Sequence, residues 1–115
     1  MEPIIDIRPW GQFKQYTLNE KTTVKIISVK AGEALSLQYH AHRKELWVVL
    51  SGVGTMQIGD KTISAKKGDE FIVEPGVHHR ISGSTEPIEF LEIAFGDFDE
   101  NDIVRLEDKY GRISK

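Results

Sequence analysis

The chain has 115 residues, a length that corresponds to one domain with a single core. Hydrophobic residues make up 39% and charged residues 29%, a balance typical of a soluble globular protein rather than a disordered one. The net charge of −3 argues against a dedicated nucleic-acid binder, and the absence of cysteine excludes disulfides and thiolate metal sites.

The first residues lack the features of an export signal. Residues 1–6 contain neither a basic region nor an apolar core. The longest dense apolar run, residues 46–50, is too short to cross a bilayer. We therefore expect a cytoplasmic protein.

Turn residues and β-prone segments alternate from the start of the chain. Arg8-Pro9-Trp10-Gly11 predicts a turn or irregular lead-in, with Trp10 covering an edge of the core. Residues 22–29 are rich in Thr, Val and Ile and predict a strand. Ala31-Gly32 predicts the turn that follows it.

Residues 35–42 predict a strand whose two faces differ in polarity. Successive side chains of a strand point to opposite faces, so the apolar residues share one face and the polar residues the other. The polar residues of this segment are Ser36, Gln38, His40 and His42. Gln38, His40 and His42 could bind a metal ion from the same side of a sheet.

The second half of the chain continues the pattern of short strands. Further strands are predicted, in chain order, at residues 45–50, 55–58, 62–64, 70–73, 79–82 and 87–95. The turns predicted between them are Ser51-Gly52, Gly59-Asp60, residues 66–69, Pro75-Gly76 and Gly83-Ser84. Regular short strands separated by turns predict an all-β sandwich or barrel. Residues 99–105 are the exception, where Asp99 or Asn101 could cap a short helical turn near the C-terminus.

All four histidines lie in two short stretches of the chain. His40 and His42 share the polar strand face with Gln38, and Glu45 follows within reach, while His78-His79 comes much later. Imidazole is the commonest side-chain metal ligand, so this clustering predicts that the two stretches meet around a metal ion. The alternative, polar strand residues that face solvent, would suit a single histidine better than this cluster.

The first stretch resembles the first motif of the cupin superfamily. Gly32, Gln38-x-His40, Glu45 and Gly52 keep the spacing of that motif throughout. Gln38 stands where the family usually has a histidine. The resemblance implies an all-β cupin fold, that is, a double-stranded β-helix or jelly-roll barrel, as a single domain over residues 1–115.

The second stretch resembles the second cupin motif. After Gly68, His79 matches the ligand position that two intervening residues separate from the expected glycine, Gly76. Pro75 is displaced by one residue, and Gly83 stands where the family has asparagine. Neither departure removes a ligand.

Longer blocks of sequence resemble a narrower family. In chain order they are Arg8-Pro9-Trp10-Gly11 and residues 35–49, 102–105 and 108–112. These blocks are similar to the type II mannose-6-phosphate isomerase domain, a cupin that usually follows a mannose-1-phosphate guanylyltransferase domain. The resemblance covers nearly the whole chain but no transferase domain, so we do not expect transferase activity.

The resemblance implies a metal-dependent isomerase that interconverts mannose 6-phosphate and fructose 6-phosphate through an enediol. The family spacing selects Gln38, His40, Glu45 and His79 as ligands of one divalent ion, with His42 as the alternate ligand. Nitrogen and oxygen ligands without sulfur suit Zn²⁺, Mn²⁺, Fe²⁺, Co²⁺ or Ni²⁺.

Catalytic and substrate-binding residues are expected from the same resemblance. Arg43 and Glu45 would act in catalysis, and His42 would carry the proton, because a metal-bound Glu45 is a poor free base. The positively charged candidates for binding the 6-phosphate are Arg43, Arg112, Lys44 and Arg80. The alternative for each is a surface charge or a salt bridge.

Two other functions remain open at this point, since one barrel hosts many chemistries. The first is a non-catalytic cupin module that binds a sugar or a nucleotide sugar. The second is another metal-cupin enzyme, such as an epimerase or a dioxygenase. Turnover separates the isomerase from the binding module, and bound iron with oxygen consumption identifies a dioxygenase.

We expect a homodimer that binds a small sugar phosphate and has no nucleic-acid or membrane partner. Residues 35–39 carry apolar side chains opposite the ligands, and residues 87–95 are apolar on much of both faces. A strand that is apolar on both faces is normally covered on both. A second subunit would supply the second cover.

Overall fold

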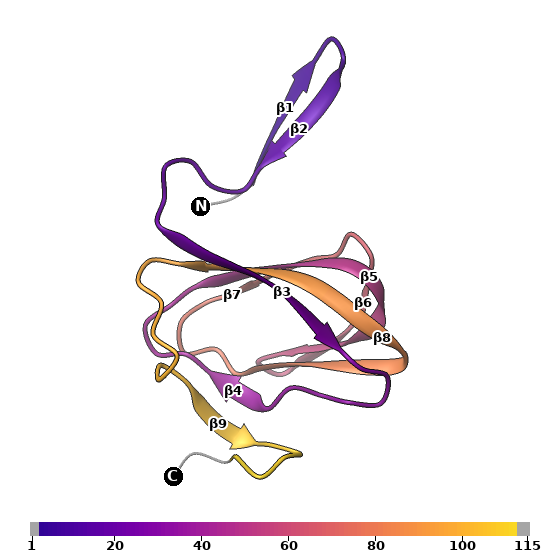
Figure 1. The fold of residues 1–115 in the computed structure, drawn as a ribbon, viewed down its shortest axis with the longest axis vertical. Helices are drawn as coiled ribbons and strands as arrows, with labels where there is room; N and C mark the ends of the chain where they lie inside the picture. Colours follow the sequence, from indigo (N-terminus) through magenta and orange to yellow (C-terminus); the bar gives the residue numbers. More distant parts are fainter. Residues whose placement is uncertain (1–2, 113–115) are drawn as a thin grey trace.

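The computed structural model describes residues 3–112, and these residues form strands and turns but no helix (Figure 1). The strands are β1 (Ile4–Arg8), β2 (Gly11–Gln15), β3 (Thr22–Val29), β4 (Leu37–Tyr39), β5 (Glu45–Ile58), β6 (Lys61–Lys66), β7 (Glu70–Val73), β8 (His79–Phe95) and β9 (Val104–Glu107). Among the described residues there is accordingly no helix of the length and apolarity needed to cross a membrane. The strands predicted at residues 22–29 and 70–73 are confirmed as β3 and β7.

The two longest strands, β5 and β8, form the centre of the barrel. They pair with each other in antiparallel fashion along most of their length. β5 also pairs with β6 and β7, β8 also pairs with β3 and β4, and β9 pairs with β4. Among residues 3–112, β1 and β2 pair with no other strand than each other, and they project from the barrel as a separate hairpin (Figure 1).

The main core fills the inside of the barrel. Its largest fully buried hydrophobic side chains are Trp47, Phe90, Met56, Ile81 and Ile88. Trp47 stacks on Phe90 with the ring centroids 4.4 Å apart. Trp10 lies at the turn of the projecting hairpin and is 73% exposed, so the prediction that it covers the core is wrong.

A smaller apolar cluster lies on the outer face of the central strands. Leu46, Val48 and Ile93 are buried there, and Tyr16, from the connection between β2 and β3, packs against them. The central strands are therefore apolar on both faces, as the sequence predicts for residues 87–95. Tyr16 of the same chain therefore covers part of the outer apolar face of the central strands.

Two predicted turns are bends within long strands. β5 continues through Ser51-Gly52, and β8 continues through Gly83-Ser84. Gly52 has a φ of 82°, and a Cβ at this position would lie 1.9 Å from the backbone oxygen of Pro87. Glycine therefore lets β5 bend closely against β8 where the sequence alone predicts a chain reversal.

The strand that carries the polar face is shorter than predicted. β4 ends at Tyr39, and the chain turns away after His40. Gln38 and His40 are buried on the inner side, whereas His42 is exposed. The prediction that His42 shares their face is therefore wrong, because strand alternation ends with the strand.

The predicted helical turn near the C-terminus is also wrong. The Asp99 carboxylate accepts a hydrogen bond from Asn101 N–H at 2.9 Å, and its carbonyl oxygen accepts one from Asp102 N–H at 3.0 Å. Asp99 thus caps a tight turn, and β9 follows and pairs with β4. The backbone N–H and C=O groups at the end of this segment form hydrogen bonds with β4, so they are not available for hydrogen bonds within a helix.

Replacing Gly52 with alanine tests the bend in β5. We expect Gly52→Ala to lower the free energy of unfolding by roughly 2–5 kcal/mol, because the new Cβ must displace the β8 backbone at a positive φ. Gly68→Ala is the control, since Gly68 has a φ of 90° but no atom within 4 Å of the added Cβ. The free energy of unfolding of Gly68→Ala, measured by urea denaturation, is expected to fall by only about 1–2 kcal/mol. Equal losses in the two variants would contradict the close approach of β5 and β8.

Candidate metal centre

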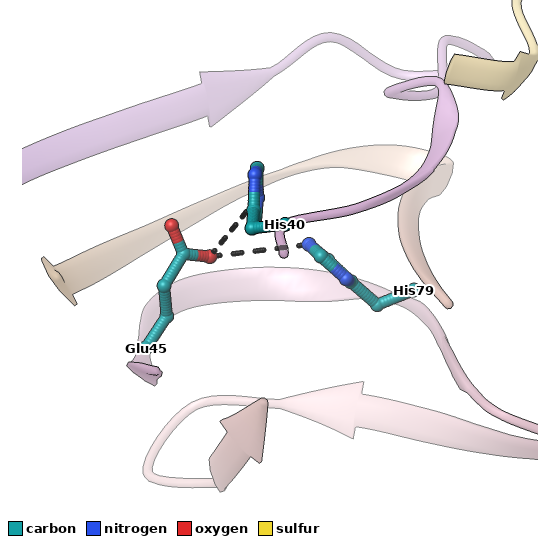
Figure 2. A group of neighbouring side chains, drawn as sticks. All are labelled: His40, Glu45 and His79. Carbon is teal, nitrogen blue, oxygen red and sulfur yellow. Dashed lines mark ion pairs between the residues drawn. The ribbon is translucent and has the colours of Figure 1, made fainter. Parts of the chain in front are cut away.

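Three buried side chains from separate parts of the chain converge inside the barrel (Figure 2). His40 follows β4, Glu45 begins β5 and His79 begins β8. One ligand atom of each lies within 4.8 Å of the other two. Their exposed fractions are 3%, 0% and 0%. The structure thus brings together three of the four residues selected by the motif spacing.

One oxygen atom of Glu45 is the point on which both imidazoles converge. Glu45 Oε1 lies 3.6 Å from His40 Nε2 and 3.9 Å from His79 Nε2 (Figure 2). The same oxygen accepts a hydrogen bond from Trp47 Nε1 at 3.1 Å. Trp47 also packs edge-on against His79, so the core residue forms one wall of the cluster.

Backbone carbonyls determine which nitrogen of each imidazole carries a proton. His40 Nδ1 lies 2.7 Å from the carbonyl oxygen of Asp102, and His79 Nδ1 lies 3.0 Å from that of Val77. A carbonyl oxygen can only accept a hydrogen bond, so each Nδ1 is the donor. The Nε2 atoms that face Glu45 therefore carry lone pairs whenever the rings are neutral.

The lone pairs of His40 Nε2 and His79 Nε2 face the negatively charged oxygen of Glu45. Because all three atoms are electron-rich, a cation between them would stabilise this arrangement. Burial lowers the pKa of His79 to about 4, so this ring is neutral at neutral pH and does not supply the charge itself. His79 Nε2 is buried without a hydrogen-bond partner among residues 3–112. A metal ion fits this donor set, because it would bind both ring nitrogens and the carboxylate at once.

Arg43 holds the other oxygen of Glu45. Its Nε donates to Glu45 Oε2 at 2.9 Å and its Nη1 to the carbonyl oxygen of Asp99 at 3.0 Å. The guanidinium carbon lies 4.4 Å from the centre of the Phe98 ring. Nη2 is 3.5 Å from His40 Nε2, too long to satisfy that nitrogen fully. Arg43 is thus a buried group that orients the carboxylate.

Gln38 lies next to the cluster. It pairs with His79 across β4 and β8 and is 8% exposed. Its side-chain oxygen is 3.4 Å from Ser36 Oγ, the distance of a weak hydrogen bond. Gln38 is therefore on the correct side of the sheet for a fourth ligand, and that role stays a prediction.

The other two histidines point away from the cluster. The side chain of His42 is 87% exposed, with Nδ1 3.5 Å from an oxygen of Asp102. His78 stacks on Tyr39 with ring centroids 5.2 Å apart. Only one of the adjacent His78 and His79 faces inward, in agreement with alternation along a strand. The structure does not bring His42 to the cluster, and its predicted roles as alternate ligand and proton carrier are not tested by this geometry.

Three of the predicted phosphate-binding cations have other partners. Lys44 Nζ lies 3.6 Å from Glu74, and Arg80 donates to two backbone carbonyls. Arg112 forms a two-point ion pair with Asp108, with Nε–Oδ2 and Nη2–Oδ1 distances of 2.7 and 3.2 Å. A hollow of about 350 Å³ beside Arg112 does not include the cluster. Phosphate binding by these residues stays a prediction.

Two charged side chains near the cluster were not predicted from the sequence. Lys25 on β3 and Glu92 on β8 are direct partners across the sheet, and Glu92 is 7% exposed. Lys25 Nζ lies 4.2 Å from the centre of the Phe98 ring, which Arg43 also contacts. The alternation of side chains along a strand could have predicted that Glu92 is buried, because Glu92 lies on the same face of β8 as the buried Phe90.

Residues 96–102 contact the chain segment that carries His40 and Arg43. The Asp102 carboxylate accepts hydrogen bonds from the backbone N–H groups of Ala41 and His42 at 2.8 and 3.0 Å. The carbonyl oxygen of Asp102 accepts a hydrogen bond from His40, and that of Asp99 accepts one from Arg43. The same segment therefore holds His40 and Arg43 in place beside Glu45.

Comparisons with known proteins identify relatives of the chain. A family model described as "Mannose-6-phosphate isomerase C-terminal" matches residues 5–108. The xanthan biosynthesis protein XanB of Xanthomonas campestris pv. campestris (strain B100) is 39% identical over 107 residues, which are 91% of this chain and 23% of that protein. Mannose-1-phosphate guanylyltransferase ManC of Salmonella typhimurium (strain LT2) is 35% identical over 108 residues, 92% of this chain and 22% of that protein. The chain thus spans less than a quarter of the length of these relatives.

A solved structure supports the fold. A cupin protein from Bacteroides fragilis is 28% identical, with a TM-score of 0.62, and the match covers 71% of this chain and 72% of that chain. The predicted all-β cupin barrel is confirmed. The short helical turn predicted near the C-terminus is absent from the barrel among residues 3–112.

The buried carboxyl of Glu92 predicts a pH dependence of stability. Burial and the nearby charge of Glu45 raise the pKa of Glu92 from 4.5 to about 7. Between these pH values the folded chain holds a proton that the unfolded chain has lost. The stability contributed by neutral Glu92 is therefore full below pH 4.5 and is lost as the pH rises through 7.

Glu92→Gln removes this ionisation at nearly constant shape. We expect the variant to be more stable than the parent at pH 8, by on the order of 1–3 kcal/mol, and not to be more stable at pH 4.5. Urea denaturation of chelator-treated protein at both pH values measures the difference. A difference that does not change with pH would contradict the raised pKa.

Proposed function

The chain belongs to the family of the mannose-6-phosphate isomerase C-terminal domain, whose fold is that of the cupins, and from this premise we propose that it is a metal-dependent sugar-phosphate isomerase. The reaction is the interconversion of mannose 6-phosphate and fructose 6-phosphate through an enediol. The observation that carries the proposal is the convergence of two imidazole lone pairs on the buried carboxylate of Glu45.

The metal ligands in this proposal are His40 and His79 through Nε2 and Glu45 through Oε1. Gln38, beside His79, is the fourth. The chemistry supplied by a bound divalent ion is polarisation of the sugar carbonyl and stabilisation of the negative charge that develops on its oxygen. The nitrogen and oxygen donors suit Zn²⁺, Mn²⁺, Fe²⁺, Co²⁺ or Ni²⁺.

Glu92 is the proton carrier in this proposal. The forward reaction removes a proton from C2 of the aldose and returns one to C1 of the enediol. Arg43 and Trp47 donate hydrogen bonds to the two oxygens of Glu45, so both oxygens already have partners. A pKa of about 7 lets the Glu92 carboxyl accept and release a proton near neutral pH. Glu92 therefore takes the role first predicted for His42.

Arg43 and Lys25 are proposed to bind the 6-phosphate. Both contact the ring of Phe98. Substrate entry then requires the segment Gly96–Asp102 to move, which frees the side of each cation that Phe98 occupies. Arginine and lysine together suit a phosphate dianion.

A second candidate function is a non-catalytic sugar- or nucleotide-sugar-binding module with a structural ion. The observation that favours it is the closure of the cluster, whose three residues are at most 3% exposed. Closed metal sites are typical of structural ions, whereas catalytic sites keep a position open. Turnover by the metal-loaded protein separates the two candidates.

Removing ligands one at a time tests the metal site and the activity together. We expect Glu45→Ala and His79→Ala to lose the bound ion and at least about 100-fold of the isomerase activity, because each removes a direct ligand. Elemental analysis and a coupled isomerase assay, with each candidate metal added back, measure both. Circular dichroism checks that each variant is folded.

The matched control is His78→Ala, one residue away and facing outward. It is expected to keep both metal and activity, and so is His42→Ala. Loss of metal in Gln38→Ala would support the fourth ligand. Full metal content without interconversion of the two sugar phosphates above a chelated control would refute the isomerase and favour the binding module.

The proton carrier is tested by Glu92→Gln. We expect normal metal content but a fall in kcat of at least about 100-fold, because the amide cannot accept the proton from C2. Glu89→Gln is the control, since Glu89 lies on the same strand but bonds to Ser28 at the exposed surface. Exchange of the C2 proton with deuterated solvent by the Glu92→Gln protein at the parent rate would contradict the assignment.

A further inference from the structure

The two histidines of the metal centre are held in place by different means. His79 begins β8, and its Nδ1 donates to the carbonyl oxygen of Val77, two residues earlier in the chain. His40 lies one residue beyond the end of β4, where the pairing of β4 with β9 has already stopped. Its Nδ1 donates to the carbonyl oxygen of Asp102, 62 residues later in the chain. The orientation of the His40 ring therefore depends on a distant residue.

The side chain of Asp102 binds the same stretch of chain. Its Oδ1 accepts a hydrogen bond from the backbone N–H of Ala41 at 2.8 Å, and its Oδ2 accepts one from that of His42 at 3.0 Å. Ala41 and His42 directly follow His40. Asp102 thus contacts the ring of His40 through its carbonyl oxygen and the backbone beyond His40 through its carboxylate.

The carboxylate of Asp102 is nearly buried, with its side chain 11% exposed. Removing a carboxylate from water is costly unless hydrogen bonds replace its hydration. The two backbone N–H groups supply one such bond to each oxygen. Ala41 and His42 are themselves exposed, so water could serve their N–H groups equally well. The burial of Asp102 therefore indicates that it fixes the position of this turn rather than only satisfying its polar groups.

The neutral His40 ring has a competing hydrogen-bond partner in Glu45. Glu45 Oε1 lies 3.6 Å from His40 Nε2 (Figure 2). In the other tautomer, Nε2 would carry the proton and could donate it to this oxygen after a small movement of the ring. His40 would then lack the lone pair with which it binds a metal ion. The carbonyl oxygen of Asp102 opposes this tautomer, because it accepts a hydrogen bond from a protonated Nδ1.

We infer that Asp102 is a positioning residue for the metal centre. Its carboxylate attaches it to the turn after His40, and this attachment keeps its carbonyl oxygen at His40 Nδ1. His40 Nε2 consequently stays unprotonated and directed at the position of the ion. The inference rests on the metal site of the proposed function but not on isomerase turnover.

NMR of the chelator-treated protein tests the tautomer directly. Long-range correlations between ring protons and nitrogens distinguish a protonated Nδ1 from a protonated Nε2. In mildly alkaline buffer we expect the His40 proton on Nδ1 in the parent, and a new Nε2–H form in Asp102→Ala. His79 is the internal control and is expected to be unchanged, because its Nδ1 partner is Val77. An unchanged His40 tautomer in Asp102→Ala would overturn the inference.

Titration with Zn²⁺ tests the consequence for metal binding. We expect the Kd of Asp102→Ala to rise roughly 10–100-fold, the usual effect of losing a group that orients a ligand. Asp102→Asn keeps one acceptor oxygen and is expected to show a smaller rise. Asp69→Ala is the matched control, because Asp69 also accepts a backbone N–H, that of Lys66 at 3.0 Å, in the turn between β6 and β7. An equal loss of affinity in Asp69→Ala would assign the effect to general destabilisation and overturn the inference.

The two measurements separate this inference from the proposed function. A parent protein that binds none of the candidate ions would refute the proposed function, and the NMR result would still decide whether Asp102 positions His40. Circular dichroism checks the fold of each variant. If Asp102→Ala does not fold, Asp102→Asn replaces it in both measurements, with the same directions of change expected.

Discussion

The buried carboxylate of Glu45 is the group on which the interior of this barrel depends. A charged group without contact to water is costly unless it is paired and hydrogen-bonded. Arg43 binds one oxygen and the Trp47 indole binds the other. Two imidazole nitrogens face that second oxygen, and backbone carbonyls prevent either ring from turning its N–H toward it in the neutral state. The same contacts that stabilise the fold therefore create a site for a positive ion.

Closure of the barrel, rather than pairing of neighbouring strands, brings the three groups of the site together. Glu45 pairs with Ala94 near the end of β8, while His79 stands at the beginning of β8. The two ends of β8 approach each other because this strand and β5 both bend midway along their length. The close contact of Gly52 with the β8 backbone is part of that bend. A change in the middle of either strand would consequently reach the metal-binding residues.

Backbone carbonyls of residues 96–102 fix the orientation of two side chains of the site. The carbonyl oxygen of Asp102 selects the tautomer of His40, and that of Asp99 binds Arg43. A movement of residues 96–102 away from His40 and Arg43 would break these hydrogen bonds. Such a movement would free the His40 ring to turn, and a bound ion would keep it in place.

The sequence by itself determined those features that depend on neighbouring residues. Alternation and turn chemistry act over a few residues, so β3, β7 and the Gly59-Asp60 turn were predictable, and motif spacing selected the residues that meet in the cluster. Only the tertiary structure decided that Ser51-Gly52 bends instead of reversing the chain, because this depends on the distant β8 backbone. It also decided that His42 leaves the strand face and that Glu92 enters the interior, since burial depends on which strands close around a position. Trp10 is exposed for the same reason: no strand of its own barrel, among the described residues, lies against the hairpin tip.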